Sequence, residues 1–320
     1  GEGLVDDRGG DRLLGELGQG GFGMGFDADL SEFPAQAGEA VRLLRERYPD
    51  ARIDWLVDRR HAAVLDFVPV ISRRVAVDGR RWGASFGAVR ALRRERYDVA
   101  VDLQGLVKSA AFARMSGAVR VIGFVRAHLR ERLAAGFYPE TFDPGNVRHV
   151  IDRNLSVLGL FGIAERRRRF PIDVPESGAC ESVGERVRRD GLRGYALFNP
   201  GAAWPNKQWP PARFGDVAAH VAGRHGLQPV VLWGPGEQAT AAGVVDASHR
   251  TAIAAPPTGI GDLLALARGA RLMVSGDTGP LHLAAAVGTP VVALFGPTDP
   301  ARNGPWDPSD ISLSRYDDCV

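Results

Sequence analysis

Cysteine is scarce in this 320-residue chain, which argues against a disulfide-rich secreted protein and against a cysteine-based zinc or redox site. Only Cys180 and Cys319 occur, far apart and in no spacing typical of a zinc or redox motif. Small secreted domains need disulfides to fold, whereas a chain of this length can bury a sufficient core without them. The sequence therefore predicts a protein of a reducing compartment with no zinc site.

Long apolar runs are also missing. No stretch of 18 apolar residues occurs, and the N-terminal residues are acidic and glycine-rich instead of carrying positive charge before an apolar segment. We therefore expect neither a membrane span nor a signal peptide, and we expect a cytoplasmic protein.

Lysine is nearly absent as well. Only Lys108 and Lys207 occur among the 40 basic residues, and the others are arginines. A GC-rich genome explains this bias, and chance would account for either lysine. Arginine cannot replace a compact ammonium on a flexible stem, however, so each lysine is a candidate for a specific role.

Short apolar segments alternate with helical segments along most of the chain. Strands are expected at 51–58, 73–78, 97–104, 119–124, 195–202, 228–234, 271–277 and 290–296, and helices at 37–48, 84–96, 106–117, 180–191, 212–226, 259–270 and 279–288. This alternation predicts parallel βαβ units and hence an α/β protein with two doubly wound, Rossmann-like domains. We place their boundary near Pro171, where an arginine run and two prolines interrupt the periodicity, giving domains 1–171 and 172–320.

The segment VSGDTGPLHLAAAVG carries the clearest sign of a binding site. An apolar strand runs into Asp277-Thr278-Gly279, and a helix that contains His282 begins at once. A helix N-terminus offers unpaired N–H groups and partial positive charge, which suit a phosphate, and ligands of doubly wound sheets bind at the carboxyl ends of strands. Asp277 or Thr278 would alternatively be a simple N-cap.

Two further strand ends carry candidate residues. Lys207 lies in FNPGAAWPNKQWP, between a strand and a proline-started helix, where its ammonium would suit a diphosphate leaving group. Glu237 follows the strand that ends in LWGPG and could accept hydrogen bonds from ribose hydroxyls. An acidic residue favoured by the helix dipole explains Glu237 equally well.

At these residues the chain resembles a known family. Asp277 to His282 (DTGPLH) and Phe295 to Pro300 (FGPTDP) are similar to the signature of the bacterial lipopolysaccharide heptosyltransferases, which have the GT-B fold of two domains facing a cleft. Three further segments resemble the heptosyltransferase I members in particular: DLQGLVKSAA (102–111), GRRWGA (79–84) and PNKQWP (205–210). The resemblance implies an inverting transfer of heptose from ADP-heptose to a Kdo residue of the lipopolysaccharide inner core.

The resemblance also implies roles for individual residues. The second domain would bind the ADP-sugar donor and the first the Kdo-lipid A type acceptor, with peripheral contact at the inner membrane. The donor diphosphate would contact Lys207, which thereby aids catalysis, and the backbone of Thr278 and Gly279. The remaining donor residues would be Asp277 and His282 at the sugar and phosphates, Glu237 at the ribose and Thr258 at the adenine. The acceptor residues would be Arg80, Arg81, Gln104 and Lys108, although solvated charges explain Arg80 and Arg81 at least as well.

The general base is harder to place. In the family, an Asp in the loop after the first strand deprotonates the acceptor hydroxyl, which is reasonable chemistry for a carboxylate. That loop falls within residues 15–30, LGQGGFGMGFDADL in this chain, where the apolar run of a central strand is absent. The sequence predicts a missing or distorted first strand, with Asp27 and Asp29 as the nearest candidates for the base.

Other functions have less support. The pattern Gly18-x-Gly20-x-x-Gly23 matches a dinucleotide fingerprint, but no apolar strand precedes it and Glu39 and Glu46, where an acidic residue would be needed, fall in a predicted helix. The acidic and basic residues balance to a net charge of +2, which does not favour nucleic-acid binding. The only Asp-x-Asp lies in the atypical segment, so we expect no metal and no cofactor. A nucleotide-sugar-binding relative without a base stays open.

Overall fold

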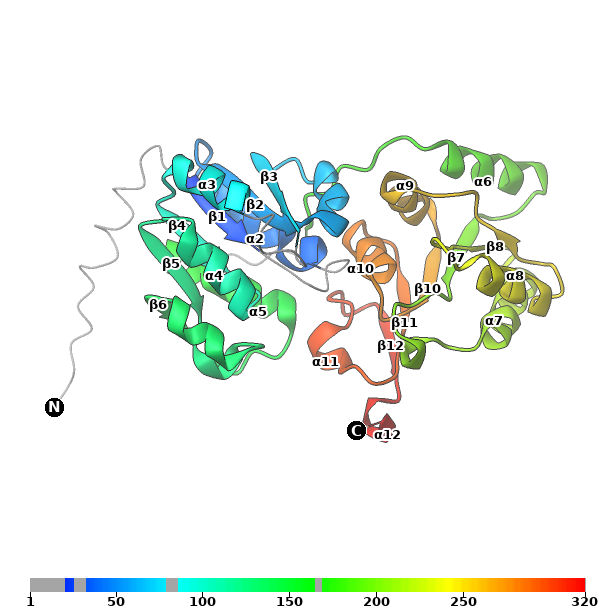
Figure 1. Ribbon diagram of the computed structural model, residues 1–320. Coiled ribbons are helices and arrows are strands. Elements are labelled where there is room, and N and C mark those ends of the chain that lie inside the picture. The colour runs from blue at the N-terminus through cyan, green and yellow to red at the C-terminus, as the bar shows by residue number, and fades with distance from the viewer. Residues whose placement is uncertain (1–20, 26–32, 79–85, 165–168, 320) are drawn as a thin grey trace. The chain divides into compact units, whose positions relative to one another are not determined.

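The computed structural model describes residues 21–25, 33–78, 86–164 and 169–319. The chain divides into two compact units, 1–167 and 168–320, a division slightly before the boundary that we placed at residue 171. We refer to them as unit 1 and unit 2, and Figure 1 shows the helices and strands of each. Their assignment to acceptor and donor binding stays a prediction.

Unit 1 contains a six-stranded sheet in which every paired strand is parallel. The order β3-β2-β1-β4-β5-β6 reverses direction between β1 and β4, as in a Rossmann fold. The strands are β1 (Gly21–Gly25), β2 (Arg52–Asp58), β3 (Arg73–Val77), β4 (Val99–Asp102), β5 (Arg120–Phe124) and β6 (Glu140–Phe142).

The first strand, β1, corrects one of our expectations and agrees with another. The glycine-rich segment forms a central strand, paired with β2 on one side and β4 on the other, so the prediction of a missing strand is wrong. Neighbours on both sides impose the extended backbone despite the poor strand propensity of glycine. Gly23 pairs with Asp54 and Ala100 within the sheet. It therefore does not lie in the strand-to-helix turn that a dinucleotide fingerprint requires.

Helices and short 3-10 segments connect the strands of unit 1. They are α2 (Phe33–Arg47), η1 (Arg59–Phe67), α3 (Phe86–Glu95), α4 (Val107–Met115), η3 (Arg126–His128), η4 (Arg132–Phe137), α5 (Val150–Ser156) and η5 (Val157–Phe161). α2 packs with α5, and α3 packs with α4. α2 begins at Phe33, earlier than predicted.

Unit 2 repeats the architecture. Its strands are β7 (Tyr195–Asn199), β8 (Gln228–Val231), β9 (Ile253–Ala254), β10 (Leu272–Gly276), β11 (Val291–Phe295) and β12 (Ile311–Ser314), in the order β12-β11-β10-β7-β8-β9 and all parallel. Every residue of the central strand β7 is buried, whereas every residue of the edge strand β12 is exposed. This contrast is typical of a parallel sheet covered on both faces.

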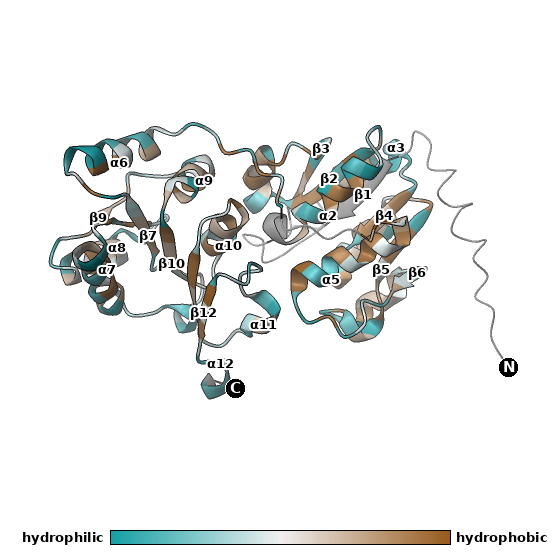
Figure 2. Cartoon of the chain, turned by 180° about the vertical axis from the view of Figure 1, so that it is seen from behind, coloured by the Kyte–Doolittle hydropathy of each residue, from teal (hydrophilic) through white to brown (hydrophobic). Residues whose placement is uncertain are grey.

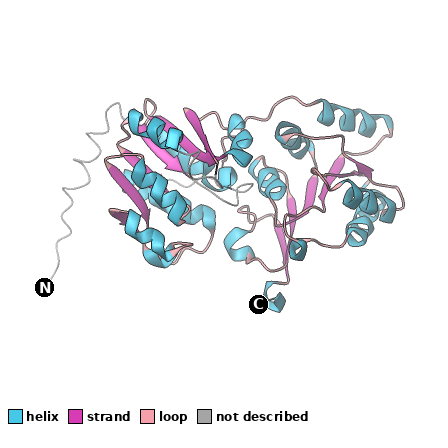
Figure 3. Ribbon diagram, viewed as in Figure 1, coloured by secondary structure: helices cyan, strands magenta, loops and turns pink. Residues whose placement is uncertain are grey.

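The helices of unit 2 pack in two groups, α7 with α8, and α9 with α6 and α10. They are α6 (Gly178–Arg189), η6 (Pro205–Lys207), α7 (Pro211–His225), α8 (Gln238–Ala247), α9 (Ile260–Gly269), α10 (Gly279–Ala286), α11 (Pro300–Asn303) and α12 (Tyr316–Cys319). Figure 2 shows apolar strands such as β7 and β10 inside the unit and polar surfaces on α6 and α7. Figure 3 shows the same alternation of helix and strand as the sequence predicted.

No helix in the described parts of the chain is long and apolar enough to cross a bilayer.

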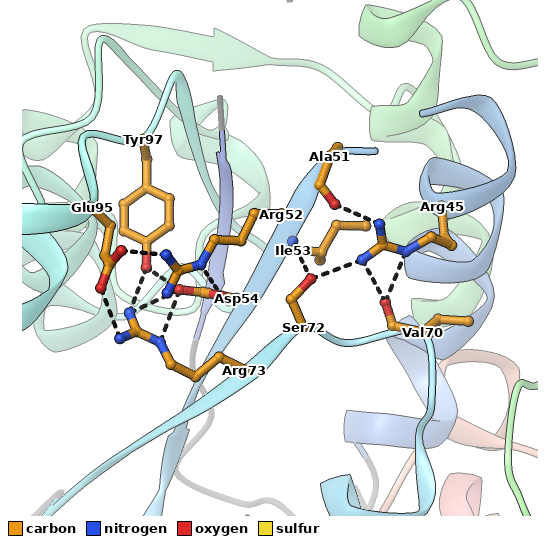
Figure 4. Close-up of polar contacts among 10 residues, drawn as sticks. All are labelled: Arg45, Ala51, Arg52, Ile53, Asp54, Val70, Ser72, Arg73, Glu95 and Tyr97. Carbon is orange, nitrogen blue, oxygen red and sulfur yellow. Dashed lines mark hydrogen bonds and ion pairs between the residues drawn. The ribbon is translucent and has the colours of Figure 1, made fainter. Parts of the chain in front are cut away.

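A network of polar and charged side chains joins the amino ends of β2 and β3 to the segment before β4, as Figure 4 shows. Asp54 of β2 is 1% exposed and accepts hydrogen bonds from the Tyr97 hydroxyl (2.5 Å), Arg73 (3.0 Å) and Arg52 (3.1 Å). Both arginines also pair with Glu95. A buried carboxylate is tolerated only when it is paired in this way.

We expect Asp54→Ala to lower the free energy of unfolding by about 2 kcal/mol, because it leaves the Tyr97 hydroxyl without an acceptor and removes the charge that both arginines face. The part-exposed arginines can regain water, which keeps the loss moderate. Asp66→Ala is the matched control, since Asp66 pairs with Arg74 at the surface, and should cost less than about 0.5 kcal/mol. Equal losses in urea unfolding would contradict the role of the network.

Candidate functional site

The carboxyl ends of four neighbouring strands in unit 2 gather most of the predicted donor residues. β11, β10, β7 and β8 lie side by side and run in parallel, so their carboxyl ends meet at one edge of the sheet. The polar residues at or shortly after these ends are Thr298, Asp277, Asn199 and Glu237.

Asp277 is the centre of this edge. Its side chain is 1% exposed, and its Oδ2 accepts hydrogen bonds from the Lys207 ammonium and the Thr298 hydroxyl, both at 2.7 Å. Its Oδ1 lies 3.3 Å from Nε2 of His282. The structure thus brings together three residues that the sequence predicted, Lys207, Asp277 and His282, and adds a fourth, Thr298.

These contacts keep Asp277 ionised. Burial raises the pKa of its carboxyl, but the hydrogen bonds from His282, Lys207 and Thr298 outweigh burial and hold that pKa well below its usual range. Because both carboxylate oxygens are engaged, Asp277 is placed to hold Lys207 and His282. Its contact with a donor sugar stays a prediction.

Lys207 reaches Asp277 because the short helix η6 lies directly on the strand ends. A Cβ at Gly276 would lie 3.3 Å from the Lys207 carbonyl oxygen, so the missing side chain permits this close approach. The ammonium has three N–H donors, and within the described residues only one of them has a partner, Asp277. Two donors of a half-buried cation are therefore available to a ligand.

The N-terminus of α10 lies beside this cation, since Thr278 directly follows Asp277. Thr278 occupies the N-cap position, yet its side chain makes no capping hydrogen bond, and the helix includes Pro280 in its first turn. The Thr278 carbonyl accepts from the N–H groups of Leu281 and His282. The N-cap interpretation of Thr278 is thus wrong for its side chain, which leaves the first-turn N–H groups of α10 without a cap from Thr278.

Glu237 lies at the end of the loop that follows β8. Its Oε2 accepts a hydrogen bond from the Gly234 N–H at 2.8 Å. Its carboxylate also lies against Gly201, where any Cβ would overlap it. In this position the Glu237 carboxylate occupies the space that a side chain at residue 201 would take. Thr258 lies before α9, and no hydrogen bond between described residues joins it to the other donor candidates.

The chemistry of this edge suits an anion with two phosphates. The ionised Asp277 carboxylate lies beside the Lys207 ammonium, His282 and the N-terminus of α10. Its negative charge offsets part of the positive charge of the ammonium and the helix end. Helix N-termini and lysine side chains are common ligands of phosphate groups in proteins.

In unit 1, the carboxyl end of β4 carries the predicted acceptor residues Gln104 and Lys108. Asp102, at the end of that strand, is buried and organises the loop: its Oδ1 accepts from the N–H groups of Gln104 (2.8 Å) and Gly105 (3.3 Å). Its Oδ2 accepts from the hydroxyls of Ser109 and Tyr138, both at 2.6 Å. Burial raises the pKa of Asp102, although these bonds oppose the shift.

Lys108 lies in the first turn of α4, near charged residues at or just after the ends of β2 and β3. Burial lowers the pKa of its ammonium and Arg60 adds to this effect, whereas Asp58 and Asp78 oppose it. The two carboxylates favour the charged form of the ammonium. Lys108 is therefore a candidate ligand for an acidic group. Arg80, Arg81, Asp27 and Asp29 lie outside the described residues.

Three functional candidates emerge from the structure that the sequence did not single out. They are Thr298 on Asp277, Asn199 at the end of β7 and Asp102 at the end of β4. Each is a polar residue at or just after the carboxyl end of an apolar strand, which is the signal that could have found them.

Within residues 21–25, 33–78, 86–164 and 169–319, no three His, Cys, Asp or Glu side chains are grouped so that they could hold a metal ion. Metal independence stays a prediction.

Comparison with known proteins gives consistent matches. The family described as glycosyltransferase family 9 (heptosyltransferase) matches residues 86–319. Lipopolysaccharide heptosyltransferase 1 of Pseudomonas aeruginosa PAO1 is 28% identical over 284 residues, which cover 85% of this chain and 78% of that protein. Lipopolysaccharide heptosyltransferase 3 of Escherichia coli K12 is 29% identical over 293 residues, covering 85% of this chain and 82% of that protein.

Solved structures share the fold. A glycosyltransferase family 9 protein from Veillonella parvula has a TM-score of 0.78 at 25% identity, covering 94% of this chain and 88% of its own. The E. coli heptosyltransferase WaaC with ADP has a TM-score of 0.73 at 22% identity, covering 92% of this chain and 90% of its own. These matches confirm the predicted GT-B class of α/β fold.

Proposed function

The chain belongs to glycosyltransferase family 9, the heptosyltransferase family, and from this we propose that it transfers a heptose from ADP-heptose to a Kdo residue of the lipopolysaccharide inner core. The family places it among the enzymes that transfer heptose to lipopolysaccharide. The identity of the donor nucleotide, the Kdo acceptor and the inverting stereochemistry are parts of this proposal.

The observation that carries the proposal is the cluster of Lys207, Asp277 and His282 beside the uncapped N-terminus of α10. A nucleotide-sugar donor presents a diphosphate, and this edge of unit 2 offers an ammonium and helix N–H groups to it. A similar structure carries ADP, and another carries ADP-2-deoxy-2-fluoro heptose, which supports ADP as the nucleotide.

The proposed reaction needs three tasks from the protein. A base removes the proton from an acceptor hydroxyl while its oxygen attacks the anomeric carbon of the heptose. The bond from that carbon to the diphosphate oxygen breaks, and ADP leaves with the electron pair. Lys207 and the α10 N-terminus stabilise the negative charge that develops on the diphosphate. No step requires a metal ion.

The acceptor side of the proposal rests on unit 1. Kdo carries a carboxylate and lipid A carries phosphates, so the acceptor is acidic. Lys108 and Gln104 follow the carboxyl end of β4, where Asp102 holds the loop in place. Because this acceptor is a lipid, we propose peripheral contact with the cytoplasmic face of the inner membrane.

Incubation with ADP-heptose and a Kdo-bearing lipid A acceptor tests the proposal. We expect release of ADP and a product that is heavier by one heptose residue in mass spectrometry, with the anomeric configuration inverted and no loss of rate in EDTA. Binding of ADP without turnover would favour the alternative, a nucleotide-sugar-binding relative that lacks the base. Absence of ADP binding would contradict both.

A further inference from the structure

Asn199 joins three segments of unit 2 at the donor edge. Its side chain is buried at the end of β7, and its Nδ2 donates to Oγ of Ser275 (3.1 Å) on β10 and to Oγ1 of Thr278 (3.0 Å) before α10. The Gly201 carbonyl, in the loop that follows β7, is 3.4 Å from the same nitrogen. One amide group thus bridges the strand ends on which the donor residues stand.

The hydrogen bond from Asn199 to Thr278 bears on the position of the Thr278 hydroxyl. The Thr278 hydroxyl is 3.1 Å from Ser275 Oγ and donates to the Gly276 carbonyl at 3.3 Å, so it faces the sheet. A threonine at an N-cap position, with the extended backbone seen here, ordinarily turns its hydroxyl over the helix end to accept from the first-turn N–H groups. A bound phosphate oxygen occupies that same place.

We propose that Asn199 is a positioning residue that holds the Thr278 hydroxyl against the sheet and thereby keeps the N-terminus of α10 open for the donor diphosphate. The inference rests on the proposed function, because it assigns the ligand of that helix end. Without the Asn199 amide, Thr278 gains a free lone pair and caps α10, so the diphosphate has to displace it.

A double-mutant cycle on ADP affinity tests this role. Asn199→Ala should raise the Kd of ADP about tenfold in the otherwise unchanged protein, but less than about twofold in a Thr278→Val background, because valine has no hydroxyl with which to cap the helix. The KM for the donor should rise with the Kd, while the KM for the acceptor stays unchanged. Calorimetry with ADP alone measures the affinities.

A buried amide elsewhere in unit 2 provides the control for general destabilisation. Gln228→Ala removes the hydrogen bonds that this side chain, at the amino end of β8, donates to the carbonyls of Pro229 and Thr251, and it should lower the melting temperature without changing the Kd of ADP. An equal effect of Asn199→Ala in both backgrounds, or no effect in either, would overturn the inference. Failure of the unmutated protein to bind ADP would instead overturn the proposed function.

Discussion

Lys207→Met is expected to raise the Kd of ADP about 100-fold, which corresponds to about 2.7 kcal/mol. Methionine is close in size to the apolar part of the lysine side chain and lacks the ammonium. Two effects then add. The diphosphate loses a charge-assisted partner, and the buried Asp277 carboxylate loses the cation that is 2.7 Å from its Oδ2.

The loss of the cation beside Asp277 would not arise if Lys207 were an ordinary surface lysine. Without the ammonium, the negative charge of Asp277 is less compensated, and it opposes the binding of an anionic diphosphate nearby. The pKa of Asp277, which Lys207 helps to lower, rises in the variant. His282 and Thr298 still hold the carboxylate, so we expect the fold to persist.

Asp277→Asn in the Lys207→Met background isolates that repulsion. The double variant should bind ADP more tightly than Lys207→Met alone, because the uncompensated charge is gone. Titration calorimetry gives both affinities, and circular dichroism checks that the variants are folded. An unchanged Kd in Lys207→Met would refute the role of the ammonium, and a double variant no better than the single one would refute the repulsion.

The regular elements of both units were predictable because the chain repeats one local pattern. The buried strand β7 is apolar except for its last residue, and α7, the long helix after it, buries one face only. The short strands β6, β9 and β12 carry no such pattern, since their residues are mostly half-buried or exposed. Pairing with a neighbouring strand defines them, and such pairing is not local in the sequence.

The central strand β1 could not be predicted from the strand propensity of its residues. Glycine at 21, 23 and 25 argues against a strand, yet the segment lies between β2 and β4 and pairs with both. The convergence of Lys207, Asp277 and His282 was predictable, because the carboxyl ends of parallel strands meet at one edge of a sheet. The bridge from Asn199 to Thr278 was not, because 79 residues separate the partners and no local pattern indicates the contact.

The position of β1 also bears on which residue is the general base, and this gives the prediction with the largest expected effect. We expect Asp27→Asn to lower kcat about 1000-fold while the Kd of ADP changes little, since a positioned general base contributes about 100- to 10,000-fold. The asparagine keeps the shape of the side chain and removes its capacity to accept the proton. Single-turnover rates and ADP calorimetry measure the two quantities separately.

Asp27 is a better candidate for the base than Asp29, because it is closer in the sequence to the end of β1. β1 ends at Gly25, which pairs with Leu56 of β2 and Asp102 of β4. Asp27 follows two residues later in the sequence, and catalytic groups of doubly wound sheets come from just beyond the carboxyl ends of strands. Asp29→Asn is the matched comparison: a larger loss there would assign the base to Asp29. Full activity in both variants would place the base elsewhere, and ADP binding without turnover in the unmutated chain would mean that this member of the family has kept its donor site and lost its base.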